Sequence, residues 1–383
     1  MPRQPIPVNP SVLVWARRAL GLTVEDTSIA ADIPAELLRA FESESRPKAP
    51  TIGQLRRLAA TYKRPFGALL LPSAPSIPPL PDDHRTFGGK AAKVGRGTVA
   101  LIREAQRMQE IATELLEPQE LTSILDRIPR FDAFRDGAFV AGRATREILG
   151  VKIQEQMGWE KRDALNAWRA KVQMQGVVVL MKALPEGKEI RGFSLYSPRK
   201  IPMIVINKTD RAEQARIFTI FHEYGHLALR RGGICAEQND VRVEKWCNQF
   251  AAALLLPEEE VRRQTGWVDS TEVVARLADQ YRVSRPAVAI RLIELGLADQ
   301  TLYDKVEAEA DKRKPSDNDR EPRIPQTVRR LAEVGIGYGK IVLDALQNES
   351  ITTATASNYL DLRIGNLEDF REKVAGTFHR YGT

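Results

Sequence analysis

Cysteine and histidine are scarce in this sequence. Of its 383 residues only two are cysteine and four are histidine. Two cysteines, Cys235 and Cys247, cannot form a disulfide framework, which suits a reducing compartment, and Cys247 is expected to be a buried apolar thiol. No apolar run approaches the roughly 20 residues needed to span a bilayer, and the N-terminus lacks a signal-peptide core. We therefore expect a soluble, cytoplasmic protein.

An excess of one charge is also lacking. The chain has 57 basic and 50 acidic side chains, which leaves a formal charge of +7. This mild bias is compatible with nucleic-acid binding but does not indicate it. Neither an internal repeat nor a glycine-rich loop that could cradle a nucleotide is present, so repeat architectures and nucleotide-binding enzymes are not indicated. The length is sufficient for two or three domains, each with its own core.

Two of the four histidines lie four residues apart with a glutamate between them. His222, Glu223 and His226 form the pattern H-E-x-x-H inside an apolar run that is compatible with a helix. Residues four apart project from one helix face, and neutral imidazole is a common zinc ligand. Zinc lowers the pKa of a bound water to about 7, and a neighbouring carboxylate can accept its proton. The pattern predicts a zinc hydrolase site with Glu223 as the base. The alternative is a surface helix that carries two histidines by chance.

A third metal ligand is expected from a later helix. Apolar residues recur at helical spacing from Val243 to Leu254, and Pro257 marks the end of this pattern. Glu244 falls on the apolar side, where a carboxylate is costly unless a cation neutralises it. Glu244 is the predicted ligand and Asp240 is the second choice. The alternative for Glu244 is an ordinary solvated helix residue.

These residues resemble the ImmA/IrrE family of zinc metallopeptidases. The resemblance covers about 85 residues, from the strands near Val177 to Pro257. It rests on Phe218-Thr219-Ile220-Phe221-His222-Glu223-Tyr224-Gly225-His226 and on Glu244-x-x-x-Asn248-x-Phe250-Ala251-Ala252-x-Leu254-Leu255-x-Pro257. It implies a gluzincin-like site in which His222, His226 and Glu244 bind Zn²⁺ and Glu223 is the general base. It also implies cleavage of a partner protein, a helix-turn-helix repressor, in stress or mobile-element regulation.

Residues 1–75 have the pattern of a bundle of five short helices. Gly21 closes the first helix, Thr23 and Asp26 can form a capping box for the second, and Pro34 can start the third. The segment resembles the helix-turn-helix domain of the XRE (Cro/C1-type repressor) family, which commonly precedes an ImmA/IrrE domain. The residues that carry this resemblance are Trp15-Ala16-Arg17, Gly21-Leu22-Thr23, Phe41-Glu42-Ser43 and Pro50-Thr51-Ile52.

The expected recognition helix is poor in hydrogen-bond donors. It begins at Pro34, and Arg39 is its only basic residue. Glu36 could accept a hydrogen bond from cytosine, but phosphate would repel it. Arg39 and Glu36 are therefore the candidate DNA-binding residues, provided that the domain binds DNA. The alternative is a helical module that docks on the peptidase domain or on another helix-turn-helix protein.

A proline-rich linker over 76–97, in which His84 is expected to be solvated, separates this domain from a peptidase domain over 98–300. The patterns in this domain predict helices at 98–117, 132–149 and 159–174, strands at 176–181, 192–196 and 201–207, and the motif helix at about 211–230.

The predicted strands suggest how a substrate could bind. The second strand alternates as a half-exposed strand does, and Pro202 is tolerated on an edge strand, so we expect the third strand at the edge of the sheet. An edge strand beside the metal could pair with an extended peptide. The reaction also needs a donor to the oxyanion, for which Tyr196, Tyr224 and Arg191 are candidates. Tyr224 is expected to point away from the site, which favours Tyr196. The alternative for Tyr196 is a strand aromatic in the core.

The last third of the chain shows no further chemistry. Residues 269–297 resemble a second helix-turn-helix unit, with Asp269 and Glu272 as a capping pair. The family resemblance implies that such a unit contacts the substrate repressor, although it could serve packing alone. A charged linker is expected at 301–324. A small helical C-terminal domain is expected at 325–383.

The predicted fold is mostly α with a small β-sheet (α+β). It comprises an all-α helix-turn-helix domain, a zincin-like peptidase domain and a small helical C-terminal domain. The leading function is a zinc-dependent endopeptidase that cleaves a partner protein. One alternative is a DNA-binding transcriptional regulator whose metal site senses zinc or is vestigial. Another is the toxin component of a toxin–antitoxin pair.

Overall fold

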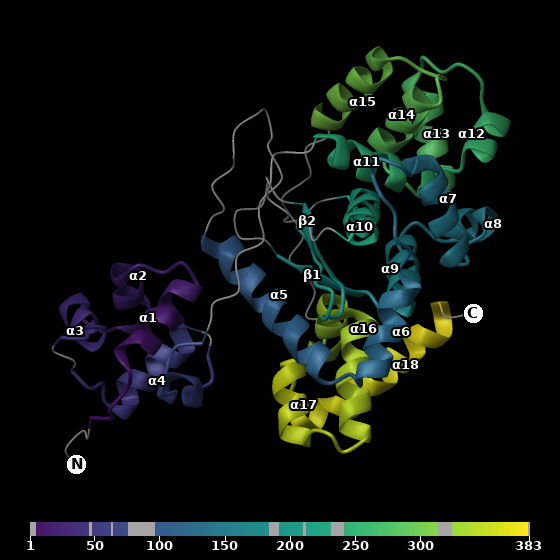
Figure 1. Cartoon of the computed structure of the whole chain (residues 1–383). Coiled ribbons are helices and arrows are strands. Elements are labelled where there is room, and N and C mark those ends of the chain that lie inside the picture. The colour runs from purple at the N-terminus through teal and green to yellow at the C-terminus, as the bar shows by residue number, and fades with distance from the viewer. Residues whose placement is uncertain are drawn as a thin grey trace. The chain divides into compact units, whose positions relative to one another are not determined.

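The structure is a computed structural model that describes residues 5–45, 48–62, 64–75, 96–183, 191–209, 212–230, 241–312 and 324–381. The described part is mostly helical with one small sheet, which confirms the predicted α+β class (Figure 1). It divides into two compact units. One contains the described residues up to 75 together with 96–105, and the other contains the described residues from 106 to 381. No helix in the described ranges has both the length and the apolar character needed to cross a membrane.

The first unit is a bundle of short helices. Thr23 and Asp26 form the predicted capping box, and Gly21, with a φ of +66°, turns the chain after the first helix. Leu38, Leu55 and Leu58 belong to its apolar core. The elements are α1 (Pro10–Ala19), α2 (Val24–Ala31), α3 (Ala35–Phe41), α4 (Ile52–Thr61) and the 3-10 helix η1 (Phe66–Leu70).

A three-stranded sheet lies at the centre of the second unit. It consists of β1 (Val178–Lys182), β2 (Gly192–Leu195) and β3 (Met203–Asn207), in the order β1-β3-β2. β3 pairs in parallel with β1 and antiparallel with β2. Every residue of the three strands is buried.

Two predictions about these strands are wrong. The third strand is central rather than at the edge, and the second strand is buried rather than half-exposed. Pro202 lies just before β3, where its carbonyl accepts a hydrogen bond from the backbone N–H of Val178 at 3.0 Å. A proline in front of a strand takes no donor out of the ladder, so it does not require an edge position.

Helices cover the sheet. α9 and α10 pack against each other and against the strands, and α11 packs on α10 and α7. From α5, Gln109 donates to the carbonyls of Leu195 and Ile201 at 3.2 and 2.8 Å. The elements are α5 (Arg96–Glu114), α6 (Pro118–Arg127), α7 (Ala138–Ile148), α8 (Ile153–Gly158), α9 (Ala164–Met174), α10 (Glu213–Ala228) and α11 (Val241–Leu255).

Four further helices follow: α12 (Glu258–Gln264), α13 (Thr271–Tyr281), α14 (Arg285–Glu294) and α15 (Gln300–Lys312). α13 and α14 pack on each other, as the predicted second helix-turn-helix unit requires. The predicted cap is wrong in detail, because Ser270 is the N-cap residue and its hydroxyl donates to Glu272. α15 extends into the first half of the range predicted to be a linker.

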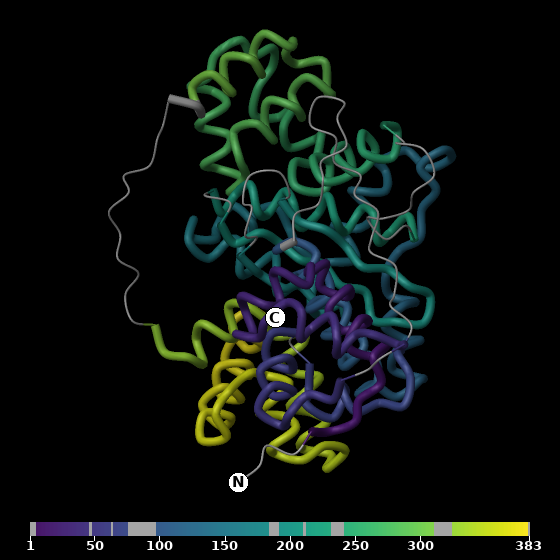
Figure 2. Tube along the Cα trace, turned by 90° about the vertical axis from the view of Figure 1, so that its left-hand side faces the viewer, coloured from purple at the N-terminus to yellow at the C-terminus, as the bar shows by residue number. Residues whose placement is uncertain are grey.

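The C-terminal helices belong to the same compact unit as the sheet, whereas the sequence predicts a separate domain over 325–383. α16 (Gln326–Gln347) packs along β1 and α9, and α17 (Thr353–Leu360), η2 (Ile364–Asn366) and α18 (Leu367–Tyr381) complete the group. Within this unit, α12–α15 and α16–α18 lie at opposite ends, with the sheet and α10 between them (Figure 2). Because α16 packs along β1, it covers an edge strand that would otherwise offer unpaired backbone groups.

Buried polar side chains hold the C-terminal end of α11. A helix leaves its last carbonyls without intrahelical partners. Here three side chains donate to consecutive carbonyls at the end of α11: Arg146 to Leu254 at 2.8 Å, Gln156 to Leu255 at 3.1 Å and Arg291 to Leu256 at 3.0 Å. Because these donors come from α7, α8 and α14, they fix α11 relative to three other helices.

Glu294, which lies beside Arg291, makes the stability of the fold depend on pH. Glu294 is 12% exposed and lies 3.5 Å from Arg291, and burial raises the pKa of Glu294 from 4.5 to about 7. A folded pKa above the ordinary value stabilises the native state fully below pH 4.5. This stabilisation, roughly 3 kcal/mol, is lost as the pH rises from 4.5 through 7.

We expect Glu294→Gln, which mimics the protonated acid, to remove most of this dependence. Thermal unfolding should give similar Tm values for the two proteins at pH 5 and a higher Tm for the variant at pH 8. The same fall in Tm between pH 5 and pH 8 in both proteins would contradict the expectation.

Candidate metal centre

The H-E-x-x-H residues lie on a buried part of α10. His222, Glu223 and His226 are only 7%, 2% and 5% exposed. Gly225 allows α11 to come close, because a Cβ at this position would lie 3.2 Å from the sulfur of Cys247. Each histidine can therefore face α11 across a short gap.

Glu244 on α11 completes a cluster with the two histidines. Its carboxylate oxygens lie 3.2 Å from Nε2 of His222 and 3.2 Å from Nε2 of His226, and the two Nε2 atoms are 3.3 Å apart. Ligand atoms at about 2.0–2.1 Å from a tetrahedral zinc ion are about 3.3–3.4 Å from one another. The three side chains therefore have the donor types and the spacing of a three-ligand zinc site, and they are the described residues that could hold a metal ion.

Two residues of α11 fix the imidazole rings. Asn248 Oδ1 is 2.8 Å from Nδ1 of His222 and accepts a hydrogen bond from it, so Nε2 is the ring nitrogen that faces the cluster. The thiol of Cys247 is buried, as predicted, and its interaction with His226 helps to raise the pKa of that imidazole. Glu244, Cys247 and Asn248 thus occupy one face of α11, three and four residues apart.

The charges of the cluster are strongly coupled. Burial alone would lower the pKa of His226, but Cys247, Glu244 and Glu223 together raise it well above its ordinary value. Burial would raise the pKa of Glu244, but hydrogen bonds from His222 and His226 hold it well below its ordinary value. A proton and a metal ion therefore compete for the same atoms, as in other sites where ligands must be deprotonated.

The predicted oxyanion donors lie in different surroundings. The ring of Tyr196 is 5.6 Å from the guanidinium of Arg230, which lies two residues after the end of α10. No contact recorded for the described residues joins Tyr196 to the three ligands, so its role stays a prediction. Tyr224 is fully buried and its ring stacks against that of Phe250, with the ring centroids 6.3 Å apart, so it packs in the core. Arg191 is exposed. Asp240, the second choice of ligand, and His84 lie outside the described residues.

The candidate DNA-binding residues are exposed on the first unit. Arg39 on α3 forms an ion pair with Glu25 on α2, so its charge is already matched by a carboxylate. Glu36 lies exposed in the first turn of α3, where a phosphate would otherwise be favoured. DNA binding by this unit stays a prediction, and neither residue adds support to it.

The comparison with known families concerns the part of the chain that carries this cluster. Residues 172–293 match the family model of the IrrE N-terminal-like domain, Peptidase_M78. This Peptidase_M78 segment covers about a third of the chain and contains the three predicted ligands and Glu223. The match supports the ImmA/IrrE resemblance and a function of the metallopeptidase type. No curated protein and no solved structure matches the chain.

The XRE resemblance of residues 1–75 lies outside the Peptidase_M78 segment and stays a prediction. Inside the segment, the sequence did not reveal the contact between Asn248 and His222. The available signal is spacing, because Asn248 is four residues after Glu244 and must lie on the same helix face.

We expect Asn248→Ala to weaken zinc binding by roughly 10- to 100-fold, because an outer partner of a metal-bound histidine fixes both its tautomer and its orientation. Zinc affinity can be measured by competition with a chromophoric chelator. Asn248→Asp, which keeps an acceptor, should retain most of the affinity. Gln249→Ala on the same helix serves as the matched control, and an equal loss in that variant would show that the helix, rather than the hydrogen bond, is affected.

Proposed function

We propose that the chain is a zinc-dependent endopeptidase that cleaves a partner protein, in the first instance a helix-turn-helix repressor. The observation that carries this proposal is the triangle of ligand atoms from His222, His226 and Glu244, with Glu223 next to His222 in the sequence. The match of residues 172–293 to a metallopeptidase family supports the same reaction class.

Different residues of the chain would bind the metal and transfer the proton. When bound, zinc supplies an activated water and polarises the substrate carbonyl. His222, His226 and Glu244 would hold the ion, and Asn248 would keep His222 in the tautomer that can bind it. Glu223 would accept a proton from the activated water and donate it to the leaving amine. The burial of Glu223 excludes competing solvent from that proton transfer.

The sheet provides a place for an extended substrate. β2 pairs with β3 on one side only, and no other described strand pairs with it. β2 also lies close to α10, since a Cβ on Gly192 would be 2.9 Å from Cγ2 of Thr219. A substrate strand that pairs with β2 would therefore run beside the helix that carries the two histidines. The sequence predicts that the third strand, as an edge strand, pairs with the substrate. Because β3 is central, we assign this role to β2.

The test uses Glu223→Gln. We expect this variant to retain about one zinc ion per chain and to cleave at least about 100-fold more slowly than the wild type, because the base is lost while the ligands remain. The substrate to assay is any helix-turn-helix repressor that is encoded beside this gene, with cleavage followed by gel and mass spectrometry.

His222→Ala is the companion variant. It should lose both the metal and the activity, because one of the three ligands is removed. Wild-type cleavage by Glu223→Gln would refute the assigned base. Preparations of the native protein without zinc, nickel, cobalt or iron would refute the metal site.

A further inference from the structure

α16 is broken in its first half. Gly335 has φ 72° and ψ 176°, a backbone conformation that is essentially restricted to glycine. The carbonyls before such a break and the N–H groups after it lose their intrahelical partners. A Cβ at position 335 would lie 2.2 Å from Oε1 of Gln173 and 2.8 Å from Nη2 of Arg169, so side chains of α9 fill the space beside the break.

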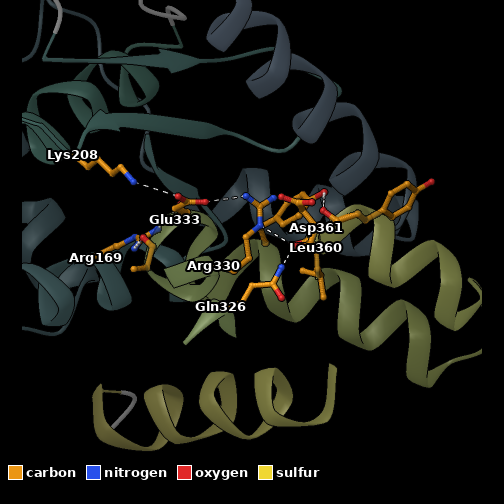
Figure 3. A network of polar contacts seen from close by, with 10 residues as sticks. Arg169, Lys208, Gln326, Arg330, Glu333, Leu360 and Asp361 are labelled. Atoms are coloured by element: carbon orange, nitrogen blue, oxygen red, sulfur yellow. Dashed lines mark hydrogen bonds and ion pairs between the residues drawn. The ribbon is translucent and has the colours of Figure 1, made fainter. Parts of the chain in front are cut away.

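These two side chains of α9 also satisfy the freed backbone groups. Arg169 donates to the carbonyls of Ala332 and Glu333 at 2.7 and 3.1 Å. Gln173 accepts from the N–H of Gly337 at 3.0 Å. The same guanidinium donates from Nε and Nη2 to the carbonyl of Val179 on β1, at 3.0 and 2.5 Å. One arginine thus joins α9, the edge strand β1 and α16, at one end of the polar network drawn in Figure 3.

Arg169 is an unusual residue to bury. It is 4% exposed, and burial lowers its pKa to about 9, so the group still carries its charge at neutral pH. All of its recorded hydrogen bonds go to backbone carbonyls. Only a forked, planar group with several donors can reach carbonyls on two elements at once, and lysine cannot replace it in this geometry.

Trp168, the residue before Arg169 on α9, contacts α10, the helix that carries His222 and His226. Trp168 is fully buried, and its ring meets that of Phe221 edge to face, with centroids 4.9 Å apart at 84°. Phe221 directly precedes His222. Two consecutive residues of α9 therefore have different partners: Arg169 bonds to the broken part of α16, and Trp168 packs against α10.

We infer that Arg169 is a positioning residue for the metal site, through which the C-terminal helices set the placement of α10. This inference concerns the site of the proposed function, but it requires only that α10 responds to α9. A displaced α9 moves Trp168 and, with it, Phe221 and the imidazole of His222. A purely structural role for Arg169 would lower stability without changing α10 in the folded protein.

The test compares Arg169→Lys with Arg330→Lys in the full-length protein. Arg330 also anchors the C-terminal helices, by donating to the carbonyl of Leu360 at 2.6 Å and to Glu333 at 3.1 Å, but its recorded contacts do not reach α9 or α10 (Figure 3). Both variants should lower Tm. Only Arg169→Lys should speed amide hydrogen exchange across 213–228 and weaken zinc binding, by roughly 2- to 30-fold.

Gln173→Met provides a milder variant in case Arg169→Lys does not fold, and the same two changes are expected with a smaller size. Unchanged hydrogen exchange of 213–228 in folded Arg169→Lys and Gln173→Met would overturn the inference. An equal change in Arg330→Lys would also overturn it. The exchange measurement needs no metal, so a wild-type protein that binds no zinc would refute the proposed function and leave this inference open to its own test.

Discussion

The approach of α11 to α10 is the constraint on which the candidate site depends. A glutamate and two histidines that face one another in a buried gap are costly unless a cation or a proton is shared among them. The gap has the required size because Gly225 presents no side chain to Cys247, and the helices can then bring the ligand atoms to within 3.2–3.3 Å of one another. Buried polar groups elsewhere in the second unit support these two helices.

That support comes largely from buried guanidinium groups. Arg146 and Arg291 donate to the last carbonyls of α11, and Arg169 donates to carbonyls of β1 and of the broken α16. Burial lowers the pKa of Arg146 to about 10 and that of Arg169 to about 9, and both remain charged at neutral pH. A charged donor makes a stronger hydrogen bond to a carbonyl than a neutral one does, which offsets part of the desolvation cost. Buried guanidinium groups therefore hold the end of α11 directly and join α9, which packs on α10, to β1 and α16.

Local signals in the sequence predicted much of this structure. The capping box of α2, the three strands and the helical face shared by His222 and His226 all depend on residues close together in the chain, and all are present. Glu244 could be predicted because a carboxylate on the apolar side of a helix needs an explanation. Strand order could not be predicted, because three short, fully buried strands have no alternation that distinguishes a central strand from an edge strand. Pro202 then favoured the wrong order.

Long-range polar contacts were outside the reach of sequence patterns. Gly335 looks like an ordinary weak point in an apolar helix, and nothing near it in the sequence indicates that Arg169, 166 residues earlier, occupies the space beside it. For the same reason, residues 325–383 look like a separate domain until the covered edge of β1 is seen. Spacing along a helix reveals which residues share a face, but not which distant element that face meets.

The boundaries of the Peptidase_M78 segment bear on what the catalytic unit is. The match begins at residue 172, after Arg169, and ends at 293, before α16. It therefore contains the candidate ligands but not Trp168, Arg169 or the C-terminal helices. A metal site works only when its ligands are held within about half an ångström of the productive geometry, and such precision comes from the groups that pack behind them. Trp168 and Arg169 provide that packing on the α10 side, and the C-terminal helices hold Arg169 in turn. The smallest part of this chain that can hold α10 in place therefore extends from α9 to the C-terminal helices, well beyond the matched segment.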